Sequence, residues 1–484
     1  MAAPRPPLHP GTSHCPLSSA SSHGMGIEEY YEFIGPYNIE IPRRRRSWRR
    51  KASDTLLGCC ILLRMLGGLV LTFGGGTLWL LKALQMTLYG LLLMPGVVRA
   101  LTWYMTSYRV IRKIEYGKGP RSYLDVYLPP AESFPGISGT SGTYRLPVII
   151  YVNGGAWILG HRIYAVLLGR YLSEQGVVLM SVDYRNFPQG TISDMEADVA
   201  QAVAWVLREA GRYSGDPSQV LIMAHGSGAH VAAQAFLQQA NRVARAVDRG
   251  GAPSIGRSRE ELELELTGCA GQTKNAAAGR DSGTIALLSG RDAERGVPPH
   301  MWSPNDLQAF IGVSGGYSIP ALVDTLDQRG LSCRAFLSIM EGGASGARAL
   351  EALPRHSPEH ILKAPGFKQR GAVAFLCPTV LLHGGSDRTM PSQQSTSFAK
   401  ALSQAGRTDV QVQVFPGRSH TDLVLEDVLL MGERAPLIRR AMRCVEESCP
   451  HRPLPDRTEA QKADAKAPFM AHWLVQLARK ISPF

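Results

Sequence analysis

The fold is decided by residues 220–230, which read VLIMAHGSGAH. An apolar run comes first, a cluster of small residues follows, and residues 231–243 then show a helical pattern. This order predicts a strand, a sharp turn and a helix. It is typical of a nucleophile elbow, a strained turn that holds a reactive side chain above an α/β sheet.

The elbow departs from its usual pattern by one residue. That pattern is small-x-nucleophile-x-small, and on residues 224–228 it puts Gly226 in the place of the nucleophile and Ser227 one position later. One residue in a helix turns a side chain by about 100°, so Ser227 is expected to miss a base that faces position 226 unless the turn is rebuilt. A turn centred on Ser227 would also need a small residue where His225 stands.

Strands alternate with helices from about residue 107 onward. Besides the strand that feeds the elbow, apolar runs predict strands at 124–128, 148–152, 177–182, 307–313, 379–382 and 410–415. Helical patterns cover 163–175, 195–210 and 231–243. This alternation predicts an α/β fold with a mainly parallel sheet flanked by helices.

An acid and a base are expected beyond the elbow, because the triad of this kind of fold runs in the order nucleophile, acid, base. Asp387 lies on the loop after the run 379–382, where an orienting acid belongs. His420 follows the last strand and suits a general base. His383 closes the strand before the acid and is interpreted as structural. The predicted catalytic set is therefore Ser227, Asp387 and His420.

An oxyanion hole is predicted after the strand 148–152. Gly154 and Gly155 follow that strand, and glycines let backbone N–H groups approach a developing negative charge. A second match to G-x-S-x-G centres on Ser314, but Pro320 stands where the elbow helix should run, so Ser314 is rejected as nucleophile. Arg185 is expected to shape the fold, through a pair with Asp198, rather than to touch substrate.

Two apolar segments precede the α/β region. Residues 55–81 are apolar except for Arg64, and residues 83–98 are again largely apolar. Each is slightly short for a membrane span of about 20 residues. Seven of the nine residues 43–51 are basic, which favours a cytosolic flank. We expect a membrane hairpin with a cytosolic α/β domain. The alternatives are one span, which would put the domain in the lumen, and a buried helical pair in a soluble fold.

Composition excludes some classes of function and indicates how the chain is divided into segments. The net charge is +12, but no nucleic-acid-binding fold is recognisable, and the eight cysteines lack metal-ligand spacing, so they are interpreted as free thiols. No metal or cofactor is implied, and the oligomeric state is left open. The expected divisions are a disordered basic arm at 1–54, membrane segments at 55–104, the α/β-hydrolase domain at 105–448 with a disordered insertion at 244–303, and a tail at 449–484. An amphipathic helix at 469–481 of the tail is expected on the membrane surface or on its own domain.

Several segments resemble isoprenylcysteine α-carbonyl methylesterases, a family of α/β-hydrolases. The most specific are 184–195 (YRNFPQGTISDM) and 336–341 (FLSIME), and the others are 153–160, 228–230, 314–341 and 417–427. The resemblance covers roughly residues 60–435, apart from the insertion. It implies a membrane-bound serine esterase of the endoplasmic reticulum and Golgi that removes the methyl ester from prenylated cysteine.

Two motifs of that family differ in this chain. The family's His-Gly-Gly begins here with Asn153, and its Gly-Gln-Ser-Ala-Gly-Ala-His reads AHGSGAH at 224–230, with Gly226 at the aligned nucleophile position. Two hypotheses follow. The chain is an esterase in which Ser227 attacks, or it is an inactive relative that binds prenyl or other lipid groups without hydrolysis.

Overall fold

The computed structural model describes most of the α/β region. The described residues are 28–34, 37, 39–45, 77–134, 145–248, 302–328, 336–337, 339–340, 351, 353–450, 455, 457–458 and 469–483. The first apolar segment, up to residue 76, and residues 249–301 of the expected insertion lie outside them.

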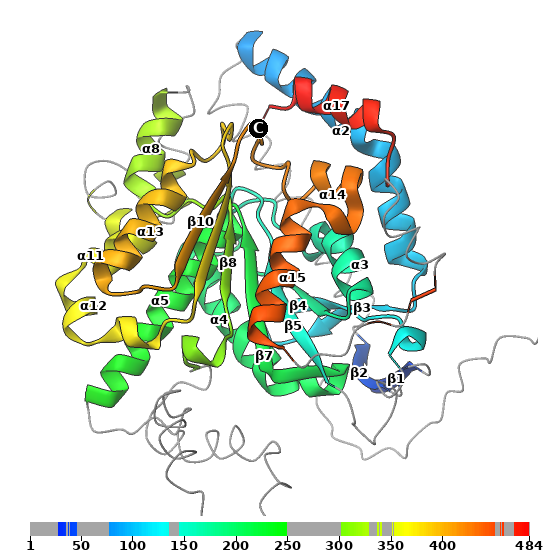
Figure 1. Cartoon of the computed structure of the whole chain (residues 1–484), viewed down its shortest axis with the longest axis horizontal. Helices are drawn as coiled ribbons and strands as arrows, with labels where there is room; N and C mark the ends of the chain where they lie inside the picture. Colours follow the sequence, from blue (N-terminus) through cyan, green and yellow to red (C-terminus); the bar gives the residue numbers. More distant parts are fainter. Residues whose placement is uncertain are drawn as a thin grey trace, which may run out of the picture.

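An eight-stranded sheet forms the centre of the protein (Figure 1). Its order is β10-β9-β8-β7-β5-β6-β4-β3. The strands are β3 (Val110–Glu115), β4 (Tyr123–Tyr127), β5 (Leu146–Val152), β6 (Val178–Val182), β7 (Gly215–His225), β8 (Phe310–Val313), β9 (Thr379–Gly384) and β10 (Val410–Phe415). All pairs from β6 to β10 are parallel, whereas β3 and β4 pair antiparallel at the edge. The expected α/β-hydrolase fold with a mainly parallel sheet is confirmed.

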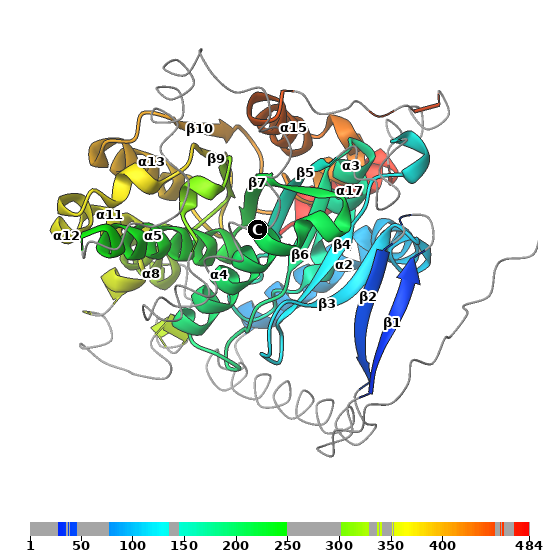
Figure 2. The ribbon, with the colours of Figure 1, turned by 90° about the horizontal axis from the view of Figure 1, so that it is seen from below.

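Helices cover both faces of the sheet and define two hydrophobic cores (Figure 2). One core contains α4 (Ile192–Glu209), α5 (Ser227–Asp248), α8 (Ile319–Gln328), α11 (Pro358–Lys363), α12 (Pro365–Gln369) and α13 (Gln393–Ala405). The other contains α2 (Thr77–Thr106), α3 (Val166–Glu174), α14 (Glu426–Met431), α15 (Pro436–Ser448) and α17 (His472–Ile481). Short 3₁₀ helices lie at Ala131–Ser133, Arg162–Ala165, Ala210–Tyr213, Pro304–Asp306, Leu353–His356, Ala372–Phe375 and Gly432–Arg434.

The pair expected between Arg185 and Asp198 is present. The Arg185 guanidinium donates to Asp198 Oδ1 at 2.8 Å, and the Arg185 backbone N–H donates to Asp198 Oδ2 at 2.9 Å. Thr191 and Asp194 form a capping box at the start of α4. These bonds fix the loop between β6 and α4, so this pattern shapes the fold as predicted.

The N-terminal arm contains structure that its composition does not predict. Strands β1 (Glu28–Ile34) and β2 (Ile39–Arg45) pair antiparallel. Between them, Tyr37 is buried, and its hydroxyl donates to the carbonyl of Pro129 at 2.7 Å. This long-range hydrogen bond attaches the hairpin to the domain, which corrects the expectation of a disordered arm for residues 28–34, 37 and 39–45.

Helix α2 runs along the outside of the domain (Figure 1). From Leu84 to Thr106 it is long and apolar enough to cross a membrane. One of its faces is nevertheless buried on the domain, through Tyr89, Leu93 and Tyr104. The tail helix α17 packs on α2, where Gln85 Nε2 donates to the carbonyl of Ile481 at 2.8 Å.

Candidate active site

Asp387 and His420 meet at the carboxyl edge of the sheet. Asp387 follows β9 and His420 follows β10, and Nδ1 of the imidazole lies 2.8 Å from Asp387 Oδ2. The other carboxylate oxygen accepts from the backbone N–H groups of Thr389 and Met390, each at 2.8 Å. Burial alone would raise the pKa of Asp387, but His420 and His383 hold it below its usual value. Asp387 is therefore an ionised partner that orients the imidazole.

The free side of the imidazole faces Gly226. A β-carbon on Gly226 would lie 3.0 Å from His420 Nε2 and 3.4 Å from Cε1. Gly226 has a φ of +55°, in the left-handed region, and helix α5 begins at the next residue. These are the features of an elbow, and they centre it on Gly226.

Ser227 points elsewhere. It is the first residue of α5, it is buried, and its side chain neighbours the hydroxyl of Tyr184. Among the described residues, no hydrogen bond joins Ser227 to His420. The geometry brings together Asp387, His420 and Gly226, and Ser227 lies apart from them. The reason is that Gly226 has the left-handed φ of the turn whereas Ser227 already belongs to α5, so the two positions point in different directions.

Two glycines let the elbow approach strand β5 closely. A β-carbon on Gly228 would lie 2.4 Å from the carbonyl oxygen of Asn153, and one on Gly154 would lie 2.8 Å from the carbonyl oxygen of His225. Both distances are shorter than real contacts allow. Gly228 is two residues after Gly226, so the small-residue pattern also fits an elbow centred on position 226.

The predicted oxyanion loop lies beside the elbow. The Cα of Gly154 is 4.0 Å from the position of a β-carbon on Gly226. Gly155, Ala156 and Trp157 follow with positive φ angles of 140°, 52° and 62°. Successive residues of this kind can form a concave set of backbone N–H groups that suits an anion. Asn153 turns away, because its amide donates to Ser181 Oγ at 3.0 Å.

Two histidines that the sequence analysis left without a role hold this arrangement. His225 Nε2 lies 3.1 Å from the carbonyl of His420, and burial lowers the pKa of His225 to about 3, so the neutral ring donates there. His230 accepts from the indole N–H of Trp157 at 3.0 Å and contacts the carbonyl of His356 at 2.6 Å. Burial lowers the pKa of His230 to about 4. Their positions in the sequence, on either side of the elbow, were the signal that could have identified them.

The other candidates are accounted for. His383 contacts Ser395 Oγ at 2.7 Å and the carbonyl of Met390 at 2.8 Å, which agrees with a structural role. Ser314 follows β8, has a φ of +48° and is fully buried. No hydrogen bond between Ser314 and His420 occurs in the described part of the chain. Over the same residues, no group of three or more His, Cys, Asp or Glu side chains is placed to hold a metal ion.

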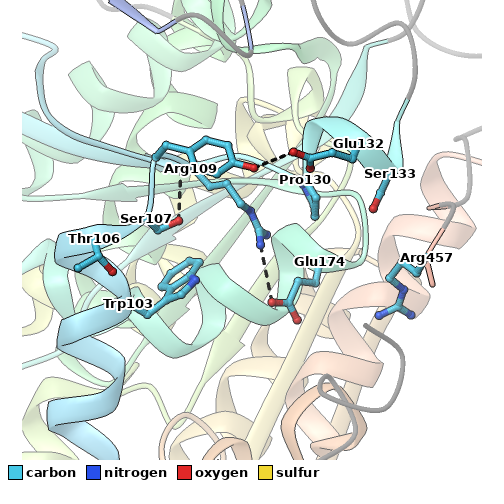
Figure 3. Close-up of a pocket in the computed structure, with 10 residues that line it drawn as sticks. Trp103, Thr106, Ser107, Arg109, Pro130, Glu132, Ser133, Glu174 and Arg457 are labelled. Carbon is cyan, nitrogen blue, oxygen red and sulfur yellow. Dashed lines mark hydrogen bonds and ion pairs between the residues drawn. The ribbon is translucent and has the colours of Figure 1, made fainter. Parts of the chain in front are cut away.

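A pocket of about 420 Å³ opens away from these residues, between the end of α2 and α3 (Figure 3). Its charged groups are largely paired: Arg109 lies 3.8 Å from Glu174, Tyr108 donates to Glu132, and Arg457 binds Glu433 outside the lining. None of the predicted catalytic residues lines it. We therefore assign the candidate site to the carboxyl edge of the sheet.

Known proteins resemble the chain both in part and along nearly its full length. The BD-FAE family matches residues 124–255. The probable carboxylic ester hydrolase LipM of Mycobacterium tuberculosis is 33% identical over 145 residues, 30% of this chain and 32% of that protein. A crystal structure of inhibited esterase B from Lactobacillus rhamnosis is 16% identical and covers 75% of this chain and 96% of its own, with a TM-score of 0.47.

Longer matches come from two plants. The probable isoprenylcysteine α-carbonyl methylesterase ICME of Oryza sativa subsp. japonica is 33% identical over 445 residues, 91% of this chain and 88% of that protein. The isoprenylcysteine α-carbonyl methylesterase ICME of Arabidopsis thaliana is 33% identical over 415 residues, 85% of this chain and 78% of that protein. Because this identity extends over more than three quarters of each chain, the protein belongs to the isoprenylcysteine α-carbonyl methylesterase family.

Proposed function

We propose that the protein hydrolyses the methyl ester of prenylated cysteine, with His420 as general base and Asp387 as its orienting acid. Gly154 and Gly155 are proposed to supply backbone N–H groups to the oxyanion. The observation that carries the proposal is the 3.0 Å distance between His420 Nε2 and the β-carbon position of Gly226. The substrate class comes from the names of the relatives.

In this proposal water takes the place of the serine hydroxyl. His420 Nε2 accepts a proton from a water molecule beside Gly226, and the water oxygen bonds to the ester carbonyl carbon. The oxyanion then re-forms the carbonyl and expels the methoxy group, which takes the proton back from His420. The products are methanol and the prenylcysteine carboxylic acid, which then releases its remaining proton to solvent and becomes the carboxylate. Without the serine, serine hydrolases keep a rate about 10³-fold to 10⁴-fold above the uncatalysed reaction, so turnover is expected to be slow.

Experiment can distinguish two other candidate functions from the proposed one. In the first, Ser227 is the nucleophile of a Ser/His/Asp mechanism, which requires a rebuilt first turn of α5. In the second, the chain binds prenyl or other lipid groups and does not hydrolyse them. The second is favoured by one specific observation, the lack of a side-chain hydroxyl at position 226.

The deciding experiment measures methanol release from a farnesylcysteine methyl ester by the full chain. We expect slow release that Ser227→Ala leaves unchanged and His420→Ala abolishes, and no labelling by a fluorophosphonate. Labelling that disappears in Ser227→Ala would establish Ser227 as the nucleophile. Substrate binding without release would establish the binding protein. Labelling of Ser314 would overturn the assignment of the elbow.

We propose further that the protein resides in endoplasmic reticulum and Golgi membranes with its α/β domain in the cytosol. The proposal draws on the basic run at 43–51 and the apolar sequence that follows it. Protease treatment of sealed microsomes tests the orientation. Cleavage in the loop after Ser107 is expected, whereas protection of that loop would place the domain in the lumen.

A further inference from the structure

Large exposed apolar side chains gather on one face of α2. This helix carries eight of the sixteen such side chains in the described part of the chain, among them Leu84, Leu88, Leu91, Val98, Leu101 and Met105. Helix α17 packs on α2 (Figure 1). It adds Trp473 and Leu477, which are 66% and 42% exposed. We call these eight named residues the outer face. A contiguous apolar surface of this kind marks a membrane or protein interaction site.

The opposite face of α2 is fixed to the domain along its length. Tyr89 Oη lies 3.1 Å from Thr421 Oγ1, Tyr104 Oη donates to Asp125 Oδ2 at 2.8 Å, and Gln85 bonds to the end of α17. From residue 85 to residue 104 an α-helix extends about 30 Å, the thickness of the hydrocarbon layer. If α2 crossed the bilayer in this arrangement, the attached charged groups of the domain would enter the hydrocarbon. That position is too costly for Asp125 and its partner Arg162.

The charges near the outer face favour a lipid surface over a second protein copy. Arg99 is the only charged residue from 84 to 106, and it is held aside, with its guanidinium 4.5 Å above the Phe469 ring. Lys480 is exposed at the end of α17, and the basic run 43–51 precedes the apolar sequence that enters α2. An uncharged apolar face with an exposed lysine and an exposed tryptophan beside it suits the boundary of a membrane with anionic lipids.

We infer that α2 lies in the plane of the membrane boundary and that the outer face is buried in the lipid of one leaflet. The inference deepens the membrane association of the proposed function and rests on it, but it is independent of ester hydrolysis. It replaces the spans of the expected hairpin by attachment at the membrane surface, which keeps the domain on the same side as the N-terminal hairpin, whose Tyr37 binds the carbonyl of Pro129.

The same two helices also hold the loop that carries His420. Tyr89 on α2 contacts Thr421, the next residue after His420, and donates to Glu426. Arg479 on α17 pairs with Asp422 and Asp427. The proposed base, His420, is therefore next in sequence to Thr421, which contacts the lipid-facing helix α2. A prenyl chain could remain in the leaflet while its cysteine ester reaches the site.

Depth measurements test the inference. An environment-sensitive fluorescent amino acid replaces Leu84, Leu91 or Met105 of the full chain, one at a time, and the protein is reconstituted on vesicles of phosphatidylcholine and phosphatidylserine. Lipids with quenchers at fixed acyl positions report the depth. Val412, exposed on β10, is the matched control position. We expect the three sites to be quenched at one shallow depth and the control to remain unquenched.

Two outcomes would overturn the inference. The first is a depth that changes progressively from position 84 to position 105, as in a helix that crosses the bilayer. The second is no quenching at any of the three sites, as on a surface that meets water or protein. In His420→Ala the shallow depth should persist although hydrolysis is lost. If the wild-type chain shows the shallow depth but releases no methanol, the proposed chemistry has failed and the membrane surface has not.

Discussion

The Nε2 atom of His420 lies 3.0 Å from the point where a β-carbon on Gly226 would stand. A serine hydroxyl attached there would be within reach of the imidazole, whereas Ser227 begins α5 with its side chain buried. The acid and the base therefore face a position that lacks the functional group they would activate. This relationship makes position 226 the place where activity can be gained by one substitution.

Gly226→Ser is expected to raise kcat on a prenylcysteine methyl ester by up to about 10⁶-fold, the factor by which an intact serine triad exceeds its residual activity. It should also make the protein reactive toward a fluorophosphonate. Gly226→Ala is the matched control, because it adds the same β-carbon at the same φ of +55° without the hydroxyl. An equal gain in both variants would show that the hydroxyl is not the cause.

Asp387→Asn in the Gly226→Ser background is expected to lower kcat by about 10³-fold to 10⁴-fold. An amide at this position cannot stabilise the imidazolium and favours the wrong tautomer. The measurement is kcat between pH 6 and pH 8, at substrate concentrations well above KM. A loss confined to KM would mean that Asp387 acts in binding rather than in orienting His420.

Gly155→Ala is expected to reduce the free energy of unfolding by about 3 kcal/mol, because overpacking adds to backbone strain. A β-carbon there would lie 2.4 Å from the backbone nitrogen of Gly160, at a φ of +140°. Gly371→Ala is the control: its φ is also positive, at +65°, but nothing lies within 4 Å of the added carbon. The control should lose only about 1 kcal/mol. Urea unfolding of the two variants checks this difference.

Stability is expected to fall as the pH rises from about 5 to about 8, in part because of Glu426. Burial, assisted by Asp422, raises the pKa of this carboxyl from 4.5 to about 7. A folded-state pKa above the unfolded one means that the folded chain holds the proton longer, so this stability is complete below pH 4.5 and is lost as the pH rises through 7.

Glu426→Gln removes this dependence. A shift of this size corresponds to about 3 kcal/mol at most, and unfolding free energies at pH 5 and pH 8 measure it. Glu196 and Asp306 also have pKa values raised by burial, to about 7 and about 6, so the comparison with Glu426→Gln isolates one group. Glu447→Gln, at an exposed site, should keep the dependence of the wild type. The explanation fails if both variants behave alike.

The sheet and the positions of Asp387 and His420 were predictable, because each depends on a local order of apolar strand and polar loop. That Ser227 lies outside the position of the nucleophile was also predictable, because the spacing of small residues in the elbow pattern centres the turn on residue 226. Strand β3 was missed because its alternation breaks at a bulge between Ile111 and Ile114, where Lys113 has a φ of +58°.

Other features depend on contacts between distant segments. Nothing local indicates that His230 accepts from Trp157, or that Tyr37 reaches the carbonyl of Pro129. The packing of α2 on the domain could not be predicted from the sequence for a different reason. Its buried and exposed faces are both apolar, so no periodicity in the sequence distinguishes the face that meets the domain from the face that meets lipid.

The close approach of Gly228 to Asn153 and of Gly154 to His225 has a consequence for finding related chains. A change of residue 226, which lies in the turn beside these two contacts, alters the chemistry and leaves the backbone path intact. Any side chain at 154 or 228, by contrast, would push the two segments apart. Relatives that have lost the serine should therefore keep this glycine pair. A search anchored on the pair would recover them, and a search anchored on the serine would pass over them.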